Sequence, residues 1–124
     1  TYNAAISACE KGARWLEALG LLADMALRRL EPDVVTYNAA ISACGKDAQW
    51  HKALETLFGM RLQQLEPDVI TYNAAISACE KGARWLEALG LLADMALRRL
   101  EPDVVTYNAA ISACGKDAQW HKAL

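Results

Sequence analysis

The sequence has no long apolar segment, only two histidines and no closely spaced pair of cysteines. A membrane-spanning helix needs roughly 20 successive apolar residues, so the sequence predicts no membrane partner. The cysteines lack Cys-x-x-Cys spacing and neighbouring histidines, which argues against a zinc site. Neither a haem-binding pattern nor a catalytic triad is evident. We therefore expect no metal, no cofactor and no enzymatic activity.

Neither basic nor acidic residues are in large excess. The 13 basic and 15 acidic residues give a formal net charge of −2, and 54% of the residues are hydrophobic. The hydrophobic content supports a folded core, whereas the charge balance gives no general attraction to nucleic acid. This balance favours a protein-interaction array or a purely structural array as one alternative function.

What the sequence does contain is a tandem repeat. The segment TYNAAISAC occurs at intervals of 35 residues, beginning at Thr1, Thr36, Thr71 and Thr106. Residues 1–35 and 36–70 agree at 22 of 35 positions, while residues 1–54 and 71–124 are identical. The unit of copying is thus a pair of repeats, 70 residues long. Equal spacing indicates one supersecondary unit stacked several times, so we expect a single array rather than separate domains.

Each repeat is predicted to be a helical hairpin, as its second copy illustrates. Apolar side chains at i, i+3, i+4 and i+7 predict a first helix over residues 36–46, with Thr36 as its N-cap. These side chains are Tyr37, Ala40, Ile41 and Cys44. A second stripe predicts a helix over residues 49–62, with Asp47 as its cap. It comprises Trp50, Ala53, Leu54, Leu57 and Met60. Pro67 ends the repeat because proline disfavours helix in the residue before it.

Stacked hairpins form an all-α solenoid, with first helices on one surface and second helices on the other. We expect first helices near residues 2–11, 36–46, 72–81 and 107–116, alternating with three complete second helices. The repeats span residues 1–33 (partial at its start), 34–68, 69–103 and 104–124 (truncated).

Three recurring residue types are assigned to packing or to solvent. The cysteines are expected to be reduced, small core residues: Cys9, Cys44, Cys79 and Cys114. The tryptophans are expected to pack between helices: Trp15, Trp50, Trp85 and Trp120. The histidines, His51 and His121, are expected at solvated helix positions.

The face of the first helix opposite the apolar stripe carries polar residues at i, i+4 and i+8, namely Asn38, Ser42 and Lys46. Repetition turns them into an asparagine ladder, a serine ladder and a lysine ladder. An amide offers a donor and an acceptor to a base edge, and a lysine neutralises a phosphate. The alternative is that asparagine satisfies local backbone groups and lysine serves solubility.

The repeats resemble the pentatricopeptide repeat family in its plain 35-residue form. The resemblance is carried by the 35-residue period, the T-Y-N opening, the K-x-A-x-W-x-x-A-L segment, the methionine late in each second helix and the closing E-P-D-V. It extends over the whole chain. The tetratricopeptide repeat, which is shorter and has glycine and tyrosine inside its first helix, fits poorly.

This resemblance implies a right-handed α-solenoid superhelix that binds single-stranded RNA, one nucleotide per repeat, with the base selected by two side chains. The first selector corresponds to Asn3, Asn38, Asn73 and Asn108. The second corresponds to the aspartate of E-P-D, at Asp33, Asp68 and Asp103. In this family the asparagine and aspartate pair favours uridine, with cytidine second. The resemblance therefore implies a U-rich RNA partner.

The family also clamps each base between apolar side chains, which correspond to Val35, Ile70 and Val105. Two sites are complete by this comparison, Asn38 with Asp68 and Asn73 with Asp103. Asn3 lacks its upstream clamp, and Asn108 lacks its aspartate. The phosphate-contacting lysine of the family corresponds to Lys11, Lys46, Lys81 and Lys116.

The sequence departs from the family pattern at two places. Where the family has glycine after the second helix, this chain has Arg29, Gln64 and Arg99. A left-handed cap there would cost about 1 kcal/mol, or the turn must differ. Leu16 and Leu86 replace an acidic surface residue, and we expect them either at inter-repeat contacts or on an apolar patch of the surface. The zinc-binding signature of an appended deaminase is absent from the sequence.

The family resemblance and the chain ends also lead to expectations about cellular location and self-association. The resemblance implies that the protein is located in a mitochondrion or a plastid. The sequence begins and ends inside a repeat, so we expect any targeting peptide to lie outside it. Open faces near Thr1 and Leu124 would bury apolar surface against further repeats, which favours end-to-end association of copies.

Overall fold

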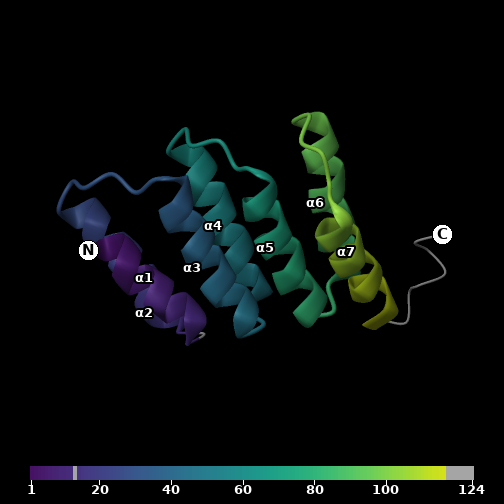
Figure 1. Cartoon of the computed structure of the whole chain (residues 1–124), viewed down its shortest axis with the longest axis horizontal. Helices are drawn as coiled ribbons and strands as arrows, with labels where there is room; N and C mark the ends of the chain where they lie inside the picture. The colour runs from purple at the N-terminus through teal and green to yellow at the C-terminus, as the bar shows by residue number, and fades with distance from the viewer. Residues whose placement is uncertain (13, 117–124) are drawn as a thin grey trace.

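The computed structural model describes residues 1–12 and 14–116, which form seven α-helices and, within those ranges, no β-strand (Figure 1). The first helices are α1 (Tyr2–Lys11), α3 (Val34–Lys46), α5 (Val69–Lys81) and α7 (Val104–Lys116). The second helices are α2 (Trp15–Leu27), α4 (Trp50–Leu62) and α6 (Trp85–Leu97). Trp120 and His121 lie outside the described residues.

The helices form the predicted solenoid of stacked hairpins. The first helices pack side by side in the order α1, α3, α5, α7, and each second helix packs against the first helices on either side of it. Figure 1 shows the hairpins succeeding one another along the long axis of the molecule, from the purple α1 to the yellow-green α7. The first helices therefore make a continuous layer, and their outward faces form one surface.

The core lies between this layer and the second helices. Ala40, Ile41 and Cys44 of α3 are fully buried, and so are Ala53 and Leu57 of α4. Buried alanines recur in α3, α5 and α7. The distance between helix axes depends on the side chains at the contact, so these small residues let neighbouring helices approach closely. These alanines are Ala40, Ala43, Ala75, Ala78, Ala110 and Ala113.

The cysteines occupy this core as free thiols, as predicted. Cys44, Cys79 and Cys114 are buried, and Cys9 is half-buried. Burial raises the pKa of Cys44 to about 11 and the pKa of Cys79 to about 12. Both thiols therefore stay protonated at neutral pH and behave as small core side chains.

The predicted start of the interior first helices is wrong, because an aspartate rather than a threonine caps them. Helix α3 begins at Val34, with Asp33 as its N-cap. The Asp33 carboxylate accepts from the Thr36 backbone N–H at 2.9 Å, and the Thr36 hydroxyl accepts from the Asp33 N–H at 3.3 Å. This reciprocal capping outweighs the modest helix penalty of two β-branched valines in the first turn.

The same aspartate and threonine bonds recur at the start of α5 and α7, between Asp68 and Thr71 and between Asp103 and Thr106. Threonine is the N-cap only in α1, where the Thr1 hydroxyl accepts from the Ala4 N–H at 3.2 Å. The second predicted cap is also wrong. Asp47 lies at the C-cap of α3, and α4 begins after Gln49, whose side chain makes no capping hydrogen bond.

Each second helix ends in a left-handed residue that is not glycine. Arg29, Gln64 and Arg99 have φ values of 59°, 63° and 60°. The backbone N–H of Gln64 donates to the Arg61 carbonyl at 2.9 Å, and that of Leu65 donates to the Met60 carbonyl at 3.2 Å. These two bonds define a Schellman motif, which satisfies carbonyls at the helix end. Of the two outcomes expected for these positions, the left-handed cap is the one adopted.

The tryptophans pack as predicted within the described residues. Trp15, Trp50 and Trp85 are half-buried against the core. Gly82 permits the contact at Trp50, because a Cβ on this glycine would lie 2.5 Å from Trp50 Cδ1. Leu16 and Leu86 are 65% and 63% exposed, so they lie on the surface and not at inter-repeat contacts. His51 is exposed, as expected.

Replacing Gln64 by glycine should raise the free energy of unfolding by about 0.5–1 kcal/mol. Glycine adopts a positive φ without a Cβ penalty, and this gain exceeds the added entropy of the unfolded chain. The adjacent Gln63, at φ −83°, is the matched control. Glycine there should lower stability by about 0.4–1 kcal/mol. Thermal unfolding followed by circular dichroism measures both, and shifts of the same sign would contradict the turn.

Candidate nucleic-acid interface

A groove of about 450 Å³ lies on the outer face of α1, α3 and α5. It is lined by Asn3, Ser7, Glu10, Val35, Asn38, Ala39, Ser42, Ile70, Asn73 and Ala74. We call it the first-helix groove. Members of the asparagine and serine ladders from successive repeats thus meet on one surface, together with apolar side chains from the starts of α3 and α5.

In this groove, Asn38 is held by hydrogen bonds to the following repeat. Its Nδ2 donates to Asp68 Oδ1 at 3.2 Å, and its Oδ1 accepts from the Thr71 hydroxyl. Thr71 is fully buried, and its hydroxyl also accepts from the Asp68 backbone N–H at 3.0 Å. Because a carboxylate only accepts, the Asn38 amide must present its NH₂ group to Asp68. The orientation of the amide is therefore fixed.

The same arrangement recurs one repeat later. Asn73 Nδ2 lies 3.2 Å from Asp103 Oδ1, and Asn73 Oδ1 accepts from the Thr106 hydroxyl. We call the two sets the Asn–Asp–Thr clusters. Their asparagines bond to the following repeat and not to the local backbone, so the local-backbone alternative does not describe them.

The end repeats lack the full cluster. Asn3 accepts from the Thr36 hydroxyl, but within residues 1–12 and 14–116 it has no hydrogen bond to Asp33. Asn108 is exposed, and no aspartate of the described chain lies within hydrogen-bond distance of it. The two clusters contain Asn38 and Asn73, the asparagines of the two sites that the family resemblance implies to be complete.

Each clustered asparagine keeps hydrogen-bonding capacity for a ligand. A primary amide has two N–H donors and two carbonyl lone pairs, and the cluster uses one of each. Asn38 and Asn73 both line the groove. A planar polar ligand there can therefore meet one donor and one acceptor on the same side chain.

The clustered aspartates are charged at neutral pH. Burial acts to raise the pKa of Asp68, but hydrogen bonds from the Thr71 backbone N–H and from Asn38 outweigh it and hold the pKa below its usual value. A hydrogen bond from the Thr106 backbone is the main cause of the lowered pKa of Asp103. The carboxylates therefore remain acceptors for their asparagines until the pH falls through these lowered values.

The three positions that correspond to base clamps are exposed in the first turns of α3, α5 and α7. Val35, Ile70 and Val105 are 65%, 65% and 59% exposed. Val35 and Ile70 line the same groove as Asn38. Exposed aliphatic side chains beside an oriented amide offer apolar contact to a flat ring whose edge the amide can bond.

The lysine ladder lies at the C-terminal ends of the same helices. Lys11, Lys46, Lys81 and Lys116 lie in the last turns of the first helices, and all are exposed. Lys46 Nζ lies 3.5 Å from Glu10 Oε2, and Lys116 forms an ion pair with Glu80. The sequence analysis did not identify these two glutamates as part of the surface.

The part that threonine plays in the site was not predicted from the sequence. Thr36 was expected to cap a helix, and the matching residues Thr71 and Thr106 had no further expected role. The D-x-x-T spacing is a local signal for reciprocal capping. It carries no information about the asparagine of the preceding repeat, which lies 33 residues earlier in the chain.

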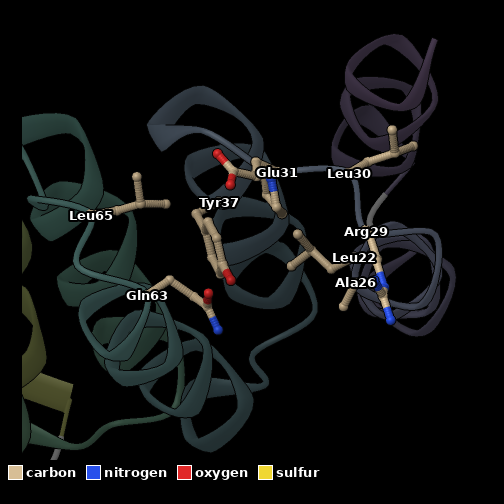
Figure 2. Close-up of a pocket in the computed structure, with 9 residues that line it drawn as sticks. Leu22, Ala26, Arg29, Leu30, Glu31, Tyr37, Gln63 and Leu65 are labelled. Atoms are coloured by element: carbon tan, nitrogen blue, oxygen red, sulfur yellow. The ribbon is translucent and has the colours of Figure 1, made fainter.

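A second cavity, of about 480 Å³, surrounds Tyr37 and shares no lining residue with the first-helix groove. Figure 2 shows the Tyr37 ring between Leu22 and Ala26 on one side and Gln63 and Leu65 on the other.

In the flanking repeats the matching tyrosine hydroxyls donate to aspartates, Tyr2 to Asp24 and Tyr72 to Asp94. Gly59 occupies the aspartate position beside Tyr37, which leaves more space there.

The described part of the chain contains no cluster of three or more side chains suited to hold a metal ion. In the same residues, no helix has the length and apolarity needed to cross a membrane.

The sequence matches the family model described as the PPR repeat family three times, over residues 1–46, 32–81 and 67–116. No curated protein matches it significantly. Among solved structures it resembles the pentatricopeptide repeat protein PPR10 in complex with an 18-nt psaJ RNA element, with 32% identity and a TM-score of 0.82. That match covers 93% of this chain and 17% of PPR10.

Two further structures support the fold alone. PPR10 from maize matches with a TM-score of 0.85 and 23% identity, over 99% of this chain and 18% of that one. The PPR domain of Arabidopsis thaliana protein-only RNase P 1, in complex with tRNA, matches with a TM-score of 0.83 and 16% identity. That match covers 99% of this chain and 67% of the other. The chain thus spans less than a fifth of the PPR10 structures.

Replacing Thr71 by valine should lower the free energy of unfolding by about 1–3 kcal/mol, because the Asp68 backbone N–H and the Asn38 carbonyl each lose their partner, the buried Thr71 hydroxyl. Thr56 provides the matched control. It is also buried, but its hydroxyl donates to the Lys52 carbonyl inside a helix, at 2.7 Å. Valine there should change stability by less than about 0.5 kcal/mol. Equal effects of the two substitutions, measured by chemical denaturation, would contradict the role given to Thr71.

Proposed function

Because the chain belongs to the pentatricopeptide repeat family, we propose that it is a module that binds single-stranded RNA along the first-helix groove, one base per repeat, with a preference for uridine. The observation that carries the proposal is the pair of Asn–Asp–Thr clusters, each of which orients an amide in the groove. A solved structure of the related protein PPR10 contains RNA, an 18-nt psaJ element, which supports an RNA partner. The module has no reaction of its own and leaves processing of the RNA to other domains or partners.

Uridine suits the hydrogen-bonding capacity that each cluster leaves unused. The pairing edge of uracil presents an N–H donor beside a carbonyl acceptor, so one amide can accept from the first and donate to the second. The aspartate sets the orientation of the amide and thereby decides which side of Asn38 or Asn73 donates. Cytidine, whose N3 is an acceptor and not a donor, cannot pair with the amide in the same register and therefore ranks second.

The base itself is held by apolar contact. One base would lie between Val35 and Ile70 and be read by Asn38 with Asp68. The next would lie between Ile70 and Val105 and be read by Asn73 with Asp103. Contact of this kind with a base face is tolerant of sequence, so selectivity rests on the amide. The lysine ladder supplies the phosphate contacts.

A protein-binding scaffold is the second candidate, and a specific surface favours it. Leu27, Leu62 and Leu97 are each 83% exposed at the ends of successive second helices. Regularly spaced exposed leucines are suited to a protein partner. A salt titration separates the candidates, because RNA binding weakens with added salt through counterion release whereas a scaffold would show no RNA binding at all.

Replacing Asn38 and Asn73 by threonine should move the base preference from uridine toward guanosine, as the family's pairing of threonine with aspartate implies. The measurement is binding to short homopolymeric and mixed RNAs, with helix content followed by circular dichroism. The matched control replaces Asn3 and Asn108, which lack a complete site, and should leave the preference unchanged. A double variant at Asn38 and Asn73 that still prefers uridine would refute the base-reading role.

The chain should bind short oligouridine weakly, with a dissociation constant of about tens of micromolar or higher. Contact with each base contributes on the order of 1–3 kcal/mol, and ordering the strand offsets much of this. An array about twice as long should bind much more tightly, because each added repeat binds a strand already held in place. Nanomolar binding by this chain, or equal affinities of the two lengths, would contradict a mechanism of one base per repeat.

A further inference from the structure

Two glutamates reach across from one repeat to the lysine of the next. Glu10 Oε2 accepts from the Ser42 hydroxyl at 3.1 Å and lies 3.5 Å from Lys46 Nζ. The contact repeats two units later, where Glu80 Oε2 accepts from the Ser112 hydroxyl at 3.3 Å and pairs with Lys116. The same three side chains therefore meet at both junctions of this type.

The junction between them is different. Gly45 occupies the position of Glu10 and Glu80, so α3 presents no carboxylate to Lys81. Among the described residues, neither Lys81 nor Lys11 has an acidic group within ion-pair distance. A Cβ on Gly45 would lie 3.3 Å from the Ala78 Cβ, so α3 and α5 pack closely where the other junctions hold a glutamate.

We propose that Glu10 and Glu80 weaken phosphate binding in every second repeat. Lys11 and Lys81 then bind the RNA backbone, while Lys46 and Lys116 contribute little. This inference rests on the proposed function. Base reading is the same in both repeat types, since each carries an asparagine and an aspartate. The electrostatic contact with the strand has a period of two nucleotides instead of one.

The carboxylates act in two ways. Each carboxylate forms an ion pair with the lysine that a phosphate would otherwise bind, and each repels the phosphate itself. The serine hydroxyl fixes the carboxylate in this position, since the same Oε2 atom accepts from serine and contacts lysine. The glutamate side chains are 30% and 18% exposed and their lysines 40% and 47% exposed. Pairs this accessible are individually weak, so they reduce phosphate binding without abolishing it.

The test replaces Glu10 and Glu80 by glutamine, which keeps an acceptor for serine and removes the charge. The matched control replaces Glu31 and Glu101 by glutamine, with the same change in net charge. Neither of these glutamates has an ion-pair partner among the described residues. They precede the first helices, about 20 Å along the helix from the lysine ladder, which is beyond the Debye length of about 10 Å at moderate salt.

The readout is the salt dependence of oligouridine binding. The slope of log K against log salt is about −0.7 per neutralised phosphate for single strands, so two effective lysines give about −1.4 and four give about −2.8. We expect a slope nearer the first value for the wild type and the control, and a slope approaching the second for the Glu10 and Glu80 variant. That variant should also bind several-fold more tightly at low salt and lose this gain at high salt.

A second readout needs no RNA. Acylation of lysine amines, resolved by residue with mass spectrometry, should be slower at Lys46 and Lys116 than at Lys11 and Lys81 in the wild type, and should even out when Glu10 and Glu80 are replaced. Absence of RNA binding by every variant would refute the proposed function. Salt-dependent binding with the same slope in the wild type and the Glu10 and Glu80 variant, or equal acylation of all four lysines, would refute the alternation alone.

Discussion

The buried hydroxyl of one recurring threonine is the group on which the rest of this structure depends. Thr71 completes the cap of α5 through Asp68 and at the same time reaches back to Asn38 of the preceding repeat. A buried hydroxyl without partners would be costly, so helix initiation, the stacking of hairpins and the orientation of the asparagine are stabilised together. A change in the relative position of two hairpins would break all three. This coupling explains how a solenoid, whose repeats contact only their neighbours, keeps a constant spacing between its asparagines.

Small side chains determine how closely those neighbours pack. Alanines line the contacts between first helices. Gly45 of α3 allows close approach to Ala78 of α5, and Gly82 at the end of α5 makes room for Trp50 of α4. The flanking junctions carry glutamate at the position of Gly45. The structural period of the array is therefore two hairpins, in agreement with the 70-residue unit of copying, although every hairpin has the same backbone plan.

The overall charge says little about the groove. A net charge of −2 would argue against a nucleic-acid partner if charge acted as a sum, but screening in salt limits each exposed charge to its surroundings within about a Debye length. What matters locally is which lysine lies beside a carboxylate. In this chain that is decided by residues 10, 45 and 80, which lie outside the two positions proposed to select the base. For the proposed function, substitutions at these residues would alter backbone affinity without altering base selectivity.

The sequence alone determined the repeat, the helical hairpin, the C-terminal ends of the first helices, the packing of cysteines and tryptophans between helices, and the residues of the asparagine and lysine ladders. These follow from periods of 3.6 and 35 residues, which are visible within the chain and need no knowledge of contacts. The tertiary structure decided what each ladder residue touches. It placed Asp33 rather than Thr36 at the helix cap, joined Asn38 to Asp68 and Thr71, paired Lys46 with Glu10, and imposed a left-handed turn on Arg29, Gln64 and Arg99. Most of these contacts link residues about 30 to 36 positions apart, so they depend on the register between packed helices, which no local pattern specifies.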